Sequence, residues 1–152
     1  MPDTTTLRGI EQGRADYAYQ CAKVGEGLNR AKKVDRAYKA YAKKIPMLVK
    51  SNGLGATFAF IFSKKKNDTE KKDYAYWKIY EHTNHWLRVE KAELFPFIPQ
   101  TDNNGRPIEF ADALILLNST EYRAVTNEVI SFFTWLRRFA EGLIEGEDEQ
   151  EG

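Results

Sequence analysis

The sequence has little of what secreted and membrane proteins carry. Its 152 residues include one cysteine and five prolines. The lone Cys21 has no partner for an internal disulfide, as is usual in a reducing cytoplasm, and we expect it to pack as a small apolar residue on a helix. The longest apolar runs, such as ALILL, are far shorter than the roughly 20 residues that cross a bilayer. Nothing resembles a signal peptide, so the sequence predicts a cytoplasmic protein without membrane contact.

Catalytic motifs are equally scarce. No Ser/His/Asp or Cys/His arrangement is present, and the two histidines, His82 and His85, lie beside Glu81 without a clear third metal ligand. The stretch GLGATF lacks the lysine and hydroxyl group of a P-loop, and Phe58 stands where a dinucleotide fingerprint has its third glycine. We therefore predict a protein that is not an enzyme and holds no metal or cofactor, with both histidines on a helix surface. The glycine turn could still offer helix N-terminal amides to an anion.

Helical periodicity, in contrast, is abundant. Apolar residues recur at steps of three and four, most regularly from Tyr122 to Leu143, and no strand alternation is evident. This pattern predicts an all-α fold, a compact single-domain bundle of about five or six helices. We expect helices over residues 7–24, 34–48, 54–64, 69–92, 109–117 and 122–143. Residues 1–145 would form the bundle domain, and 146–152 an acidic, disordered tail.

Local signals mark the expected helix ends. Thr6 is a candidate N-cap for the first helix, and Asn118 with Glu121 has the spacing of a capping box for the last. Pro46 should kink or loosen the second helix because it has no N–H to donate. In the turn SNG, Asn52 or Gly53 can take a left-handed conformation, and Gly55 would let the next helix pack closely. The prolines of FPFIPQTDNNGRP predict a long loop.

Charge is unevenly distributed along the chain. The net charge is only +1, yet fifteen Lys and Arg residues stand against five Asp and Glu residues between Lys23 and Lys78. The rest of the chain has eight basic against seventeen acidic residues. This asymmetry indicates a positive surface presented to one partner, or a solvated helical face.

A helical wheel supports the first interpretation, a positive surface that is presented to one partner. With Val34 at zero, the apolar stripe from Val34 to Leu48 falls within roughly 40° either side. A set of cations falls at roughly 140–200° on the same wheel: Lys32, Arg36, Lys39, Lys43 and Lys50. Like charges one turn apart destabilise a helix slightly, so this row does not serve helix stability. We predict that the row binds a polyanion; a plain solvent face is the alternative.

Two longer motifs resemble a known family. KKIPMLVKSNGLGATFAFIFSK, residues 43–64, and EYRAVTNEVISFFTWLRRFAEGLI, residues 121–144, are similar to the small subunit of the type III-B CRISPR effector complexes, the Cmr complexes. The opening GIEQGRADYAY resembles the family's first helix, and residues 67–118 match least. The resemblance implies a small, all-helical, non-catalytic subunit that stacks into a minor filament. Its partners would be the backbone subunit, the large subunit, further copies of itself, guide RNA and target RNA.

The resemblance also implies sequence-independent contact with the RNA backbone for antiviral defence. Carried onto this chain, it adds candidates to those of the wheel. The combined RNA-binding set is Lys32, Arg36, Lys39, Lys43, Lys44, Lys50, Lys64, Arg137 and Arg138.

Two other functions remain open. The chain could be a helical protein–protein assembly module without nucleic-acid contact, because the stretch DYAYWKIY could expose aromatic rings and Phe133 and Trp135 point away from the main stripe of the last helix. A stand-alone helical DNA-binding protein is less favoured, because no helix carries an evident base-reading set of Arg, Asn and Gln.

Overall fold

The structure, a computed structural model, describes residues 4–146, with side chains from residue 9 onward. Its described part contains six α-helices, one π-helical turn, η1, and an isolated β-bridge between Thr101 and Pro107, joined by turns and loops. The elements are α1 Thr4–Glu26, α2 Val34–Asn52, α3 Leu54–Lys64, α4 Asp73–His85, η1 Trp86–Glu90, α5 Phe110–Ile115 and α6 Ser119–Leu143. The predicted all-α fold is confirmed.

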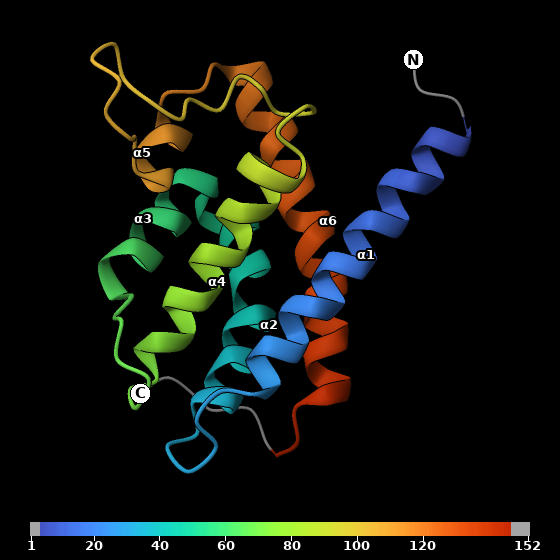
Figure 1. Ribbon diagram of the computed structural model, residues 1–152, viewed down its shortest axis with the longest axis vertical. Coiled ribbons are helices and arrows are strands. Elements are labelled where there is room, and N and C mark those ends of the chain that lie inside the picture. Colours follow the sequence, from blue (N-terminus) through green and yellow to red (C-terminus); the bar gives the residue numbers. More distant parts are fainter. Residues whose placement is uncertain (1–3, 147–152) are drawn as a thin grey trace.

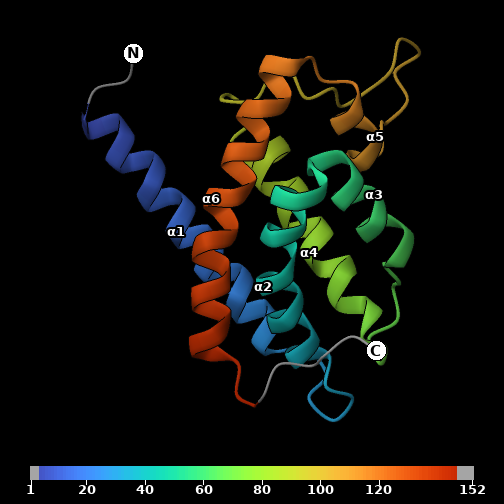
Figure 2. The same ribbon diagram turned by 180° about the vertical axis from the view of Figure 1, so that it is seen from behind.

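Helix α2 is the central element of the bundle. It packs against α6, α4, α3 and α1, with α1 and α4 toward the viewer in Figure 1 and α2 and α6 toward the viewer in Figure 2. The expected stripe from Val34 to Ile45 is in the core, whereas Leu48 is only half-buried. The helix continues through the buried Pro46 to Asn52. Because neighbours lie on several sides, residues outside the stripe are buried too: Asp35, Ala37, Lys39, Ala42 and Val49.

The chain reverses between α2 and α3 at Gly53, as predicted. Its φ of 94° is a conformation that glycine adopts without the cost of a side chain. Gly55 then lies against α6, because its amide donates a hydrogen bond of 2.6 Å to the Tyr122 hydroxyl. A Cβ at Gly55 would lie 3.3 Å from atoms of Ile115 and Tyr122, so close packing is the reason for this glycine.

Helix α6 begins with the predicted capping box. The Asn118 side chain accepts from the Glu121 amide at 2.9 Å, and the Glu121 carboxylate accepts from the Asn118 amide at 3.0 Å. Two amides that the helix leaves without partners are thereby satisfied.

Removing this cap should destabilise the fold measurably. We expect Asn118→Ala to lower the free energy of unfolding by about 1 kcal/mol, because an N-terminal amide of α6 loses its acceptor. Urea unfolding followed by circular dichroism measures the change. Asn118→Ser, which keeps an oxygen acceptor, is the control. Equal losses in the two variants would show that the cap contributes nothing.

Helix α4 is shorter than the expected helix over 69–92. It begins at Asp73, and after His85 the chain passes into the π-helical turn η1. Arg88 in this turn is buried, and its guanidinium donates to the backbone oxygens of Pro99 and Ile108 at 2.7 and 2.8 Å. The π-helical turn thus places the Arg88 guanidinium against the long loop, and these hydrogen bonds hold the loop in place. Nothing in the local pattern signals this contact.

Some expectations concern the ends of the chain. Helix α1 already includes Thr4, so the cap expected at Thr6 is wrong. The tail assigned to residues 146–152 lies, beyond Gly146, outside the described residues. None of the described helices has the length and apolarity that crossing a membrane requires.

Candidate nucleic-acid interface

The predicted row of cations on α2 is broken at Lys39. This side chain is only 6% exposed, and its Nζ donates to the backbone oxygens of Ile144 and Gly146, the former at 3.1 Å. The segment that follows α6 therefore covers this part of α2. The Lys39 ammonium group thus binds carbonyl oxygens just after the last turn of α6, where a cation also complements the helix dipole. The expectation that Lys39 faces solvent is wrong.

Arg36 also packs against the segment that follows α6. It is half-buried, and its guanidinium lies so close to Gly146 that a Cβ there would be 2.4 Å from Nε. Arg30, before α2, forms an ion pair of 2.9 Å with Glu145. These cations near the start of α2 thus face the segment that directly follows α6, up to Gly146, and they are poorly placed to meet a nucleic acid.

The second half of α2 keeps its cationic character. Lys50 lines a groove of about 200 Å³ between α2 and α6, together with Arg137 and Arg138. Lys50 and Arg138 are exposed, and Arg137 is half-buried. Lys50 is far from the two arginines in the sequence, and the packing of α2 against α6 brings the three predicted residues together. The remaining lining is apolar or neutral: Pro46, Met47, Ile130, Phe133 and Thr134.

The groove offers positive charge with little compensation. Arg137 pairs with Glu141 one turn along α6, at 3.5 Å on an exposed surface, where such a pair contributes little. The side chains of Lys50 and Arg138 have no hydrogen bond or ion pair to another described residue. No carboxylate is among the lining residues. The groove therefore suits an anion that has lost part of its hydration.

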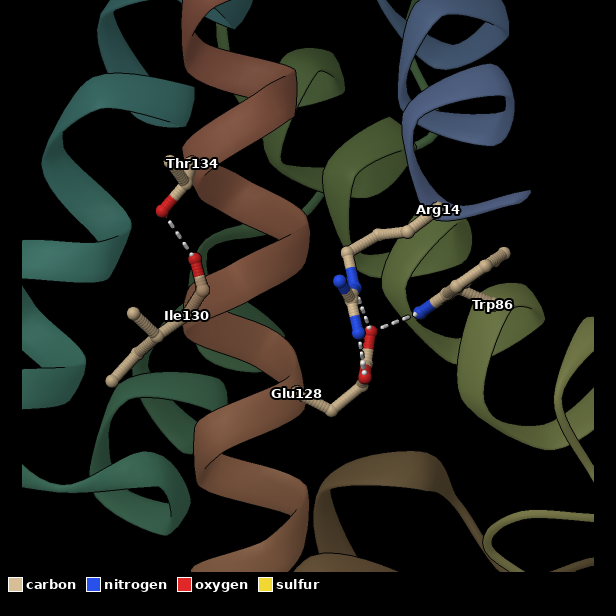
Figure 3. Close-up of polar contacts among 5 residues, drawn as sticks. All are labelled: Arg14, Trp86, Glu128, Ile130 and Thr134. Atoms are coloured by element: carbon tan, nitrogen blue, oxygen red, sulfur yellow. Dashed lines mark hydrogen bonds and ion pairs between the residues drawn. The ribbon is translucent and has the colours of Figure 1, made fainter. Parts of the chain in front are cut away.

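Hydrogen bonds on the face of α6 that lies away from the groove hold this helix in position. On the side of α1 and η1, the buried Glu128 carboxylate accepts from Arg14 Nε and Nη2 at 2.7 and 2.8 Å and from Trp86 Nε1 at 2.9 Å. Ile130 and Thr134 point toward the other side of α6, where they line the groove (Figure 3). Because α1 and η1 hold one face of α6, the groove face has a defined position next to α2.

Phe133 does not point away from the core, contrary to expectation. It is fully buried and forms the floor of the groove, in edge contact with Phe132 at 5.4 Å between ring centroids. Trp135 is half-buried and stacks on Phe139 at 5.8 Å. Helix α6 packs against both α1 and α2, so it buries a wider arc than its main stripe.

The other predicted cations lie apart from the groove. Lys44 and Lys64 both lie over the Phe60 ring, with Nζ 5.4 and 5.9 Å from its centroid. Lys43 is exposed on α2, and Lys32 is exposed in the turn before α2. The predicted set thus divides among separate surfaces and does not form one row.

The expectation that both histidines lie on the surface is wrong for one of them. His85 is exposed, but His82 is half-buried, and its Nδ1 lies 2.8 Å from the hydroxyl of the fully buried Tyr38. Burial, aided by Lys78 and His85, lowers the pKa of His82 to about 3. Within residues 9–146 no three His, Cys, Asp or Glu side chains are grouped to hold a metal ion.

Cys21 is buried, as predicted, beside these groups. It lies on α1, and burial raises the pKa of its thiol to about 12. At neutral pH the thiol is therefore protonated and packs as an apolar group.

The fold and the groove define a class of protein: a small helical bundle with a cationic groove between α2 and α6 and further lysines exposed on its surface. The defining pattern of the family described as CRISPR-associated protein (Cas_Cmr5) matches residues 10–143. The chain therefore belongs to the Cmr5 family, and it is a subunit of a type III-B CRISPR (Cmr) effector complex.

A solved structure supports the fold. A CRISPR-associated Cmr5 family protein from Thermus thermophilus superimposes with a TM-score of 0.63. The match covers 89% of this chain and 97% of that protein, with 24% sequence identity. At this identity the likeness shows a common fold, and the arrangement of the cations has to be argued from this chain.

Proposed function

We propose that this subunit contributes to a minor filament of the complex and contacts the RNA backbone through the α2–α6 groove, in a sequence-independent way. One observation carries the proposal: Lys50, Arg137 and Arg138 converge on a groove that has no carboxylate in its lining. Lys43, two helical turns before Lys50, is also exposed and extends the surface by about 10 Å along α2.

The chemistry of the groove fits phosphate better than bases. Arginine guanidinium groups bind phosphate oxygens in a forked geometry, and lysine provides a mobile point charge. The apolar floor offers no donor or acceptor set that could distinguish bases. Pairing with the guide would supply sequence recognition, and this subunit would supply positive charge at a fixed position.

Salt dependence tests this proposal. If Lys43, Lys50, Arg137 and Arg138 each meet a phosphate, the log–log slope of affinity against salt should be about −2.8, which is a loss on the order of fiftyfold between 50 and 200 mM salt. The triple variant Lys50→Gln, Arg137→Gln, Arg138→Gln should reduce the slope by about 2. Fluorescence anisotropy of labelled RNA with the reconstituted complex, and with the isolated full-length chain, measures both quantities.

A matched variant removes the same charge elsewhere. Lys23→Gln, Arg30→Gln and Arg106→Gln also neutralise three exposed cations, and this variant should keep the wild-type slope. If both triple variants lose RNA affinity equally, only net charge matters and the groove has no special role. Normal RNA affinity in a well-folded groove variant would refute backbone contact at this site.

Assembly with other proteins is a second function that the structure supports. Ile115 and Leu116, at the end of α5, are 66% and 64% exposed. They stand next to a cavity of about 450 Å³ lined in part by Leu117 and Tyr122. Apolar side chains this exposed are typical of protein contacts. We propose that this corner meets a neighbouring subunit, whether the backbone subunit, the large subunit or another copy of this chain.

A further inference from the structure

A second surface, away from the groove, combines aromatic rings with ammonium groups. Its rings come from α3 and the first half of α4, which lie on the side of the bundle away from α6 (Figures 1 and 2). Four rings with at least part of their area in solvent lie here, each with a lysine over it. This aromatic–lysine surface comprises Phe60, Phe62, Tyr74 and Trp77 with Lys44, Lys64, Lys65 and Lys78.

Lys65 is the centre of this surface. Its Nζ lies 4.3 Å from the ring centroid of Trp77, 4.8 Å from that of Phe62 and 5.2 Å from that of Tyr80. The aromatic faces that surround it come from the last turn of α3 and the second turn of α4. The Phe62 and Tyr80 centroids are 6.0 Å apart, and Lys65 lies over these two rings and that of Trp77, so the three rings are neighbours.

Two of the rings, those of Phe62 and Trp77, are not part of the core packing. Phe62 is 43% exposed, and Trp77 is half-buried, although both are large aromatic residues. The segment from Lys64 to Lys72, which borders them, has five lysines and two acidic residues. Exposed rings interleaved with cations suit a ligand that is anionic along its length and planar at its side groups, and single-stranded nucleic acid has this chemistry.

We propose that the aromatic–lysine surface binds single-stranded RNA, with bases stacked on Phe62 and Trp77 and phosphates bound by the neighbouring lysines. This inference rests on the proposed function, because it takes RNA to be the polyanion that the subunit meets. It adds a separate site with a different selectivity. The α2–α6 groove recognises phosphate in any strand, whereas stacking requires bases that are not paired.

Binding would proceed by exchange. Lys65 now lies over the rings that a base would cover, so its ammonium group has to move from the ring to a phosphate. An exposed contact of lysine with a ring is worth a factor of about 2–5 in an equilibrium constant, whereas a stacked base is worth about 5–150. Because the lysine gains a phosphate at the same time, the exchange favours the RNA. In the free protein the lysine keeps the apolar ring surface covered.

Trp77 provides a direct signal for stacking. We expect single-stranded oligouridylate or oligoadenylate to quench the fluorescence of the full-length chain, and the quenching to be lost in Trp77→Phe, although this variant keeps a ring and should keep most of the affinity. Trp86 is buried, and any signal from Trp135, which stacks on Phe139 of α6, is measured by the Trp77→Phe variant and subtracted. Phe62→Leu and Trp77→Leu should each weaken single-strand binding by about tenfold. Affinity for a duplex RNA of the same length should not change.

The control variant is Tyr19→Leu. Tyr19 is also 43% exposed, but it lies on α1 against Phe139, outside the aromatic–lysine surface. It should bind single-stranded RNA as the wild type does. Circular dichroism on each variant identifies any loss of folding, and Phe62→Leu is the cleaner change because more of its ring is in solvent.

The outcomes separate this inference from the proposed function. If the leucine variants bind single strands normally while the groove variant is impaired, the aromatic–lysine surface does not bind RNA and the groove proposal stands. If the reverse is found, the inference stands and the groove proposal fails. Equal weakening of single-strand and duplex binding by Phe62→Leu would overturn base stacking. So would a photo-crosslinker at position 62 that captures a protein subunit, and no RNA, in the assembled complex.

Discussion

Glu128→Ala should be among the most destabilising single substitutions in this protein, with an expected loss of about 3 kcal/mol in the free energy of unfolding. Glu128 is 8% exposed, and its carboxylate accepts three hydrogen bonds, two from Arg14 and one from Trp86. Removal leaves the guanidinium of Arg14 and the indole N–H of Trp86 without their acceptor in a poorly hydrated place. The cost of such unpaired groups exceeds that of the lost contacts.

Urea unfolding at neutral pH measures this loss, and a double-mutant cycle assigns it. Arg14→Ala combined with Glu128→Ala should give a coupling energy of more than about 1 kcal/mol, because the second substitution removes a partner already lost. Glu141→Ala is the control, since Glu141 makes only an exposed pair with Arg137 on the same helix. If Glu128→Ala costs no more than Glu141→Ala, the buried network does not stabilise the packing of α6.

Local patterns in the sequence are enough to predict most of the helices. The capping box at Asn118 and Glu121, the turn at Gly53 and the stripe of α6 each depend on residues within a few positions of one another. Such interactions involve only residues that are near one another in the chain, so their spacing is visible in the sequence. The family resemblance, carried by two long motifs, also indicates the Cmr5 family, and that prediction is confirmed.

The candidate site was harder to predict, because burial of a charged side chain depends on distant residues. A helical wheel assigns one buried face to α2, but this helix has neighbours on several sides. Lys39 lies 105 positions from Ile144, whose carbonyl oxygen it binds. Arg14 and Glu128 are 114 positions apart. Neither pair leaves a periodic signal, so the sequence could give the charges without giving their partners.

The cations predicted as one set serve three purposes in the structure. Lys39 binds the segment after α6 and Arg36 packs against it, Lys50 joins the arginines of α6 at the groove, and Lys44 and Lys64 lie over aromatic rings. Charge-reversal experiments on the predicted row would therefore mix a loss of stability at Lys39 with any loss of the proposed RNA binding at Lys50. Separate variants of the groove and of the aromatic–lysine surface avoid this ambiguity.

Acid should destabilise the protein through His82, starting well above the usual range for carboxylates. Burial, followed by the charges of Lys78 and His85, lowers the pKa of His82 to about 3 from an ordinary 6.5. The unfolded chain therefore binds a proton, as pH falls below 6.5, that the folded protein excludes. The His82 contribution is constant above pH 6.5, and stability falls by about 1.4 kcal/mol per pH unit from there toward pH 3. At pH 5 the loss is about 2 kcal/mol.

The variant His82→Gln isolates this effect. Glutamine keeps an acceptor for the Tyr38 hydroxyl but does not titrate, so the variant should lose about 2 kcal/mol less than the wild type on acidification to pH 5. At pH 7.5 it should be less stable than the wild type, because the imidazole ring is missing. Urea unfolding at several pH values measures both curves. His85→Gln is the control, because it keeps the His82 imidazole and its burial, which is the largest cause of the low pKa, so most of the pH dependence should remain. Parallel curves for wild type and His82→Gln would show that His82 takes up its proton in the folded state. In that event solvent from the neighbouring cavity of about 320 Å³ between α1 and α4, which His82 helps to line, would have to reach the ring.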